Sequence, residues 1–266
     1  MINQYILKYA LPEEDDEDII LEKPLIIVEE RPEPSFSRDT ISLIKEPLVR
    51  PIPRTIPSLG IRPSLKDGRL TGRGKANIKR VYNEATAAEK DYWGNWYYNA
   101  QKDVKNLSNI FKIRFDVTAA IVAALSPGNK WVDNLIAAAK LIKGESIIHA
   151  YPDNIRKALE IKKTNIPKVS GPKVTVFYQS LIDPDSVKSQ VVLDGHAINV
   201  WMGKKLSLRS APSISKKIRN KIESDYIKAA EELGVSPQSV QAVTWYIWKC
   251  LPAYPAKTPP VPMPEI

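Results

Sequence analysis

Cysteine and histidine are scarce in this chain of 266 residues. Its one cysteine, Cys250, excludes an internal disulfide framework, a cysteine-based zinc site and an iron–sulfur cluster. The two histidines, His149 and His196, argue against a multi-histidine metal site. Long apolar runs are also lacking, and with a mean hydropathy of −0.27 we expect no membrane-spanning helix. These absences predict no metal cofactor and no membrane partner, and they fit a reducing, cytoplasmic location.

Charge and proline are unevenly distributed along the chain. Residues 1–66 hold nine basic and twelve acidic residues, whereas the remainder holds 30 basic and 18 acidic residues. Nine of the 22 prolines lie in 1–66, and six follow Cys250. Proline removes a backbone donor and disfavours helix in the residue before it. We therefore expect an acidic, proline-rich disordered arm over 1–66, a folded domain over 67–250 and a proline-rich tail over 251–266.

The excess positive charge of the folded domain has two interpretations. It could form a solvated surface that aids solubility, or a face that binds a polyanion such as nucleic acid. Charge alone leaves both open, because ribosomal, architectural and enzymatic proteins share this balance. The acidic run EEDDED at 13–18 could cover such a face, although charge blocks are more often simply solvated.

The central part of the chain has helical periodicity. Apolar residues recur every three or four positions over 132–139, 214–226 and 240–247. Residues 117–125 are apolar nearly all round and predict a central buried helix. The aromatic segment 91–101 predicts a core helix, with an exposed base-stacking platform as the alternative. We expect an all-α domain of about eight to ten helices, because no strand–helix alternation or glycine-rich nucleotide motif occurs.

The most informative segment is residues 166–203, IPKVSGPKVTVFYQSLIDPDSVKSQVVLDGHAINVWMG. A predicted helix over 154–163 is followed by a tight turn and by a second helix from Pro172. Gly171 allows the backbone to approach a ligand closely. The free N–H groups at the start of the second helix favour a bound phosphate, which positions a protein on DNA without reading its sequence. This order is typical of a helix–hairpin–helix, with the hairpin at 166–173.

This segment resembles the helix–hairpin–helix DNA glycosylase superfamily, which includes endonuclease III and the 8-oxoguanine DNA glycosylases. SGPKV is similar to the hairpin motif, with Lys173 where bifunctional members carry the catalytic lysine. VVLDGHAINVWMG is similar to the segment that supplies the catalytic aspartate, at Asp194, and the spacing of 21 positions is close to the family's own. The segment 123–144 is similar to the part with the loop that probes DNA, which implies Asn129 and Lys130 as contacts.

Similar SPGxKW, GPK and QAxxW patterns also occur in viral proteins of unknown function, so the resemblance implies a diverged phage member, located in the host cytoplasm. It implies an orthogonal all-α fold and a DNA glycosylase that acts on a flipped, damaged or modified base, with lysine-dependent AP-lyase activity. A base-hypermodification enzyme and a non-catalytic DNA-binding module are the alternatives. The implied partner is double-stranded DNA held by sequence-independent phosphate contacts. A monomer is favoured, with at most a monovalent cation at the hairpin.

The two candidate catalytic residues also have simpler alternatives. Asp194 would stabilise the positive charge that develops on the sugar as the glycosidic bond breaks, and it would also cap a helix from Gly195. Lys173 would attack the sugar C1′ as a neutral amine and form a Schiff base. The alternative for Lys173 is a charged contact to phosphate.

The remaining candidates surround these two. His196 could contact the sugar–phosphate backbone or be a structural histidine. The hairpin residues that would contact DNA are Lys168, Val169, Ser170 and Gly171. Candidates for the pocket are Ser126, Gln241 and Trp245, of which the last two could instead pack in the core.

Overall fold

The computed structural model describes residues 74–147, 150–187, 189–204 and 214–249. The predicted arm, the predicted tail and His149 lie outside the described residues. The regular elements formed by the described residues are α-helices, which confirms the all-α prediction. In chain order these helices are α2 (Lys75–Asn83), α3 (Ala87–Gly94), α4 (Trp96–Phe111), α5 (Phe115–Leu125), α6 (Trp131–Lys143), α7 (Pro152–Thr164), α8 (Pro172–Ile182), α9 (Gly195–Met202), α10 (Lys216–Leu233) and α11 (Pro237–Lys249).

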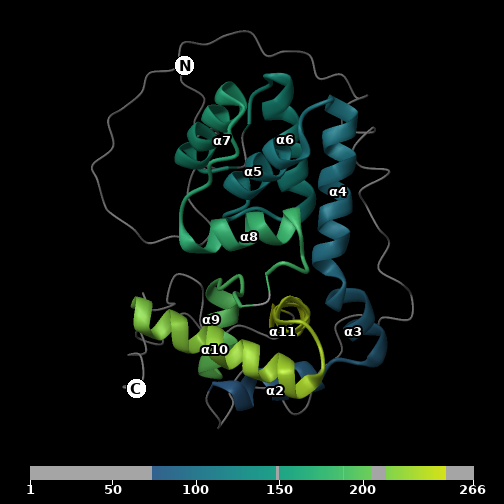
Figure 1. The fold of residues 1–266 in the computed structure, drawn as a ribbon, viewed down its shortest axis with the longest axis vertical. Coiled ribbons are helices and arrows are strands. Elements are labelled where there is room, and N and C mark those ends of the chain that lie inside the picture. Colours follow the sequence, from purple (N-terminus) through teal and green to yellow (C-terminus); the bar gives the residue numbers. More distant parts are fainter. Residues whose placement is uncertain (1–73, 148–149, 188, 205–213, 250–266) are drawn as a thin grey trace, which may run out of the picture.

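The helices form two lobes, and each lobe has its own hydrophobic core (Figure 1). The first lobe consists of α4 to α8, in the upper part of Figure 1. The second lobe consists of α2, α3 and α9 to α11, in the lower part. The lobes are interleaved in sequence, since the described chain begins in the second lobe and returns to it after α8. The folded region that the sequence presented as one domain therefore contains two packing units.

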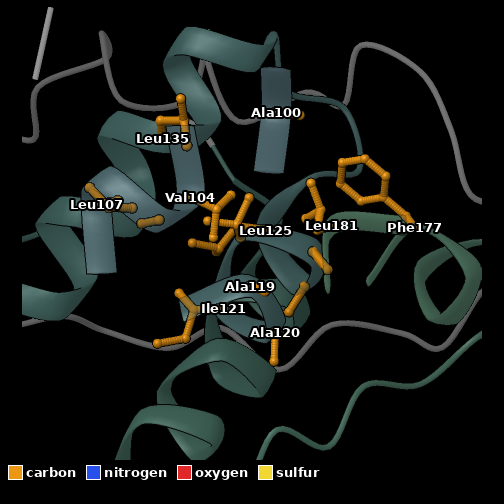
Figure 2. Close-up of a cluster of buried hydrophobic side chains, with 14 of the residues drawn as sticks. Ala100, Val104, Leu107, Ala119, Ala120, Ile121, Leu125, Leu135, Phe177 and Leu181 are labelled. Carbon is orange, nitrogen blue, oxygen red and sulfur yellow. The ribbon is translucent and has the colours of Figure 1, made fainter. Parts of the chain in front are cut away.

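Helix α5 is the centre of the first lobe. All residues from Val117 to Leu125 are buried, as the apolar pattern predicted. Figure 2 shows side chains of α4, α6 and α8 converging on those of α5, including Val104, Leu135 and Leu181. A helix that is apolar all round needs neighbours on every side, and each fully buried leucine or isoleucine contributes about 1.5–3 kcal/mol. This packing gives α7 and α8 a fixed support.

The aromatic segment 91–101 is helical and Trp93, Trp96 and Tyr97 pack in the cores, as predicted, but the segment spans two helices rather than one. Helix α3 ends at Gly94 and α4 begins at Trp96. Trp93 stacks on Tyr246 of α11 in the second lobe, with 4.1 Å between ring centroids. Trp96 instead packs against the core of the first lobe. The break between the helices therefore divides the aromatic side chains between the two lobes.

The chain crosses between the lobes over residues 183–194, and side chains of both lobes hold it there. The Tyr98 hydroxyl of α4 donates a 2.5 Å hydrogen bond to Asp185 Oδ1. From α11, the buried Gln238 side chain donates to backbone carbonyls of the crossing segment, including that of Gln190 at 3.3 Å. These bonds anchor the segment that leads directly into α9.

Candidate functional site

The predicted hairpin lies between α7 and α8, and the helix boundaries agree closely with those expected from the sequence. Helix α7 ends in a left-handed residue, Asn165 (φ 55°), and α8 begins at Pro172. Gly171 precedes Pro172 with φ 89° and ψ 139°, a backbone conformation that L-residues rarely adopt. Both helices pack on α5, so the turn between them is supported from the core.

The hairpin presents mostly exposed groups. Lys168, Ser170 and Gly171 are exposed, whereas Val169 packs against the first-lobe core. Lys173 is half-buried in the first turn of α8. That turn has no side-chain cap and no acidic residue, so no side chain of the turn accepts from the free N–H groups of the helix start. The hairpin therefore combines cations with backbone donors, which suits phosphate.

Asp194 caps the start of α9, as predicted. Its backbone is extended, and its carboxylate accepts a 2.8 Å hydrogen bond from the Ala197 N–H. The three residues before it alternate between the lobes: Val191 and Leu193 are buried in the second core, and Val192 in the first. The half-buried Asp194 therefore lies at the seam between the two lobes.

The charge of Asp194 affects the pKa of two buried tyrosines, Tyr97 and Tyr226. Burial raises the pKa of Tyr97, in the first core, well above its ordinary value, and the Asp194 charge raises it further. Burial likewise raises the pKa of Tyr226, in the second core, and Asp194 again adds to the rise. A negative charge disfavours a second one nearby, so Asp194 lies within electrostatic range of both phenols. Nothing in the sequence pattern pointed to Tyr97 and Tyr226, because they are distant along the chain.

Two candidates from α11 lie in the same region. Gln241 is only 5% exposed, and its Oε1 accepts a 2.8 Å hydrogen bond from the Tyr97 hydroxyl. The half-buried Trp245 meets His196 edge to face, with 5.9 Å between ring centroids, and the Lys249 ammonium lies 4.4 Å from the Trp245 ring. His196 lies in the first turn of α9, two residues after Asp194. The structure thus places the start of α9, Gln241 and Trp245 together at the seam.

The candidates from the loop between α5 and α6 belong to the first lobe. The Ser126 hydroxyl donates to the carbonyl of Ala123, and the Asn129 side chain donates to that of Leu125, each at 2.8 Å. These bonds close the turn after α5, and the next residue, Lys130, is exposed. Among the described residues, no hydrogen bond or ion pair links this loop to the Asp194 carboxylate.

Lys173 and Asp194 come from different lobes. Within the part of the chain that the structure describes, they form no ion pair with each other. Figure 1 shows α8 in the lower part of the first lobe, with α9 below it. The two residues thus start the helices on either side of the seam, and a ligand that reaches both would have to bridge the lobes.

Within the described ranges, no group of three histidine, cysteine, aspartate or glutamate side chains is placed to share a metal ion. None of the helices described is both long and apolar enough to cross a membrane. A monovalent cation at the hairpin stays a prediction.

The fold and the site define an all-α protein of two interleaved lobes. Asp194, which caps α9, lies at the seam between the lobes, and the basic start of α8 lies on one side of this seam. The chain belongs to a family of unknown function, DUF7178, whose model matches residues 61–251. The match includes all of the helices from α2 to α11. No curated protein and no solved structure was found to match the chain.

Proposed function

We propose that this protein is a DNA-binding enzyme of the helix–hairpin–helix glycosylase type, which acts on a damaged or modified base turned out of the duplex. The observation that carries the proposal is the position of Asp194, a helix-capping carboxylate half-buried at the seam between the lobes. Such a seam offers a place where an extruded nucleotide could meet groups from both sides.

The chemistry needs a negative charge near the sugar. Breaking a glycosidic bond builds positive charge on the sugar ring in the transition state. The hydrogen bond from the Ala197 N–H and the positive end of α9 both favour a carboxylate at Asp194. Partial burial strengthens the attraction between this carboxylate and a cationic transition state, because less water screens it. Asp194 is therefore the proposed stabilising carboxylate, while it also caps α9.

The hairpin supplies the proposed hold on the DNA backbone. Lys168 and the exposed turn would contact phosphate without reading bases. Lys173, in the first turn of α8, is the proposed nucleophile of an AP-lyase step. In that step its amine adds to C1′ of an abasic sugar and the C1′ oxygen leaves as water. The resulting Schiff base permits β-elimination of the 3′ phosphate.

The test uses purified full-length protein and a panel of duplexes that carry an abasic site or a damaged or modified base. The proposal expects base release, and a covalent protein–DNA adduct after borohydride reduction. Asp194→Asn keeps a capping side chain but removes the charge, so base release should fall at least tenfold. The exposed Asp91→Asn on α3 is the matched control and should retain activity.

Two lysine variants separate the roles of Lys173. Lys173→Arg keeps a positive charge for phosphate but provides no amine that forms a Schiff base, so it should bind DNA and give no adduct. Lys173→Ala should lose the adduct and bind more weakly. An adduct that persists in both variants would rule out Lys173 as the nucleophile.

The alternatives leave different products. A base-hypermodification enzyme would change the mass of a base in an intact strand and release nothing. A non-catalytic module would bind duplex in a salt-sensitive way, with no base release and no adduct from any duplex of the panel. Either result would overturn the glycosylase proposal.

A further inference from the structure

The start of α10 carries three positive charges that the stability of the helix does not explain. Lys216 and Lys217 are exposed, and Arg219 is half-buried. We call these three residues the α10 basic patch. Within the described residues, the side chains of Lys216 and Lys217 form no hydrogen bond or ion pair. Arg219 acts electrostatically on Glu223 one turn later, where it lowers a pKa that burial raises.

These charges lie at the unfavourable end of the helix. A helix start carries partial positive charge and is stabilised by acidic residues, yet the first turn of α10 contains none. The only side-chain cap there is Ser215, which accepts from the Ile218 N–H at 3.3 Å. Helix stability therefore does not account for the α10 basic patch, whereas a bound anion would.

The lysines near the other end of α10 behave differently. Lys75 and Lys79 of α2 both form ion pairs with Glu232 of α10, at 2.6 Å for Lys79. Glu232 thus pairs with cations of α2 beside the end of α10, whereas Lys216 and Lys217 at its start have no carboxylate partner among the residues that the structure describes. This contrast also supplies a matched control.

The starts of α8 and α10 lie toward the same side in the view of Figure 1. In Figure 1, α8 begins at the left of the first lobe, and α10 begins at the left of the second. Helix α9, which Asp194 caps, lies below α8 and overlaps α10 in this view.

We propose that the α10 basic patch is a second phosphate-binding surface for the same DNA duplex that the hairpin holds. The duplex then spans the two lobes, with the hairpin on one side of Asp194 and Lys216, Lys217 and Arg219 on the other. This inference rests on the proposed DNA-binding function and extends it to the second lobe. Duplex DNA suits such a pair of surfaces, because its backbone carries a charge every ~1.7 Å along the axis.

The experiment measures the affinity of the full-length protein for an undamaged duplex of about 30 base pairs over a range of salt concentrations, by fluorescence anisotropy. The logarithm of affinity falls with the logarithm of salt by about 0.9 for each phosphate neutralised. The triple variant Lys216→Gln, Lys217→Gln, Arg219→Gln should therefore lower this slope by about two to three. Loss of Lys216 and Lys217 should not lower the melting temperature, since it removes cations from a helix start, whereas loss of Arg219 removes a charge that favours the Glu223 carboxylate.

The control removes three positive charges elsewhere in the second lobe, by Lys75→Gln, Lys79→Gln and Lys228→Gln. Its slope should stay close to that of the wild type. An equal loss of slope in the control, or an unchanged slope in the patch variant, would overturn the proposal.

A hairpin variant separates this proposal from the one on which it rests. If Lys168→Gln lowers the slope and the patch variant does not, the hairpin binds DNA and the α10 basic patch does not. If the wild type does not bind the duplex at all, both proposals fail.

Discussion

The hydroxyl of Tyr97 donates a 2.8 Å hydrogen bond to Oε1 of Gln241, and this buried bond joins the two lobes. Tyr97 belongs to the core of the first lobe, and Gln241 lies on α11, which packs mainly in the second. The pair lies near Asp194, whose charge raises the pKa of the Tyr97 phenol. The bond thus stabilises the contact between the lobes at the point where the proposed site lies.

Removing one partner of this bond should destabilise the protein. Tyr97→Phe leaves the carbonyl of Gln241 buried without its donor, and we expect the free energy of unfolding to fall by about 1–3 kcal/mol. Urea denaturation measures this change. Tyr98→Phe is the control, because its hydroxyl bonds to Asp185 at an exposed position and should contribute about 0–1 kcal/mol. Similar losses in the two variants would contradict the special role of the buried bond.

Two substitutions at Asp194 should separate its contribution to stability from its contribution to base release. Asp194→Ala removes the cap of α9 and should lower the free energy of unfolding by about 1 kcal/mol. Asp194→Asn retains a good capping side chain and should change stability by only a few tenths of a kcal/mol. Denaturation curves for both variants, read beside base release, make the comparison. If Asp194→Asn is as unstable as Asp194→Ala, any loss of activity in it could be structural, and the catalytic assignment would lose its support.

The ion pairs of Glu232 predict a defined response to acid. Hydrogen bonds from Lys75 and then Lys79 lower the pKa of Glu232 from its ordinary 4.5 to about 2. Because the folded pKa is the lower one, these pairs stabilise the protein above about pH 4.5, and the stabilisation is lost as the pH falls towards 2. Melting temperatures of the wild type and Glu232→Gln should therefore differ at pH 7 and converge near pH 2.

Glu232 is at the surface, so salt should screen the same interaction. The gap in melting temperature at pH 7 should narrow when the ionic strength is raised. A gap that is independent of both pH and salt would show that Glu232 acts through packing rather than charge.

Gly171 should be required for the shape of the hairpin. A Cβ at this position meets nothing within 4 Å, so the cost of Gly171→Ala comes from its backbone conformation, about 1–3 kcal/mol. The hairpin would relax into another conformation, and affinity for duplex DNA should fall several-fold in the anisotropy assay. Gly144→Ala, also at positive φ in open space but after α6, should lose stability and keep its affinity. Equal affinity in the two variants would argue against a hairpin contact.

Helix boundaries were the most predictable feature of this chain. Pro172 starts α8 and Asp194 caps α9, each as expected. Capping depends on side chains within a few residues of the helix end, so the local sequence contains the information. The break between α3 and α4 was not foreseen, and neither was the close approach of Gly94 to α11, where a Cβ would lie 2.6 Å from the Ser239 hydroxyl.

The sequence by itself determined the helical class, the buried α5, the hairpin turn and the cap at Asp194, since each of these depends on neighbouring residues and their periodicity. Only the tertiary structure decided that the helices divide into two lobes, and that Tyr97, Tyr226 and Gln241 gather near Asp194. Tyr97 and Gln241 are 144 positions apart. Contacts of this kind form when whole helix faces pack together, and no local pattern specifies which faces will meet.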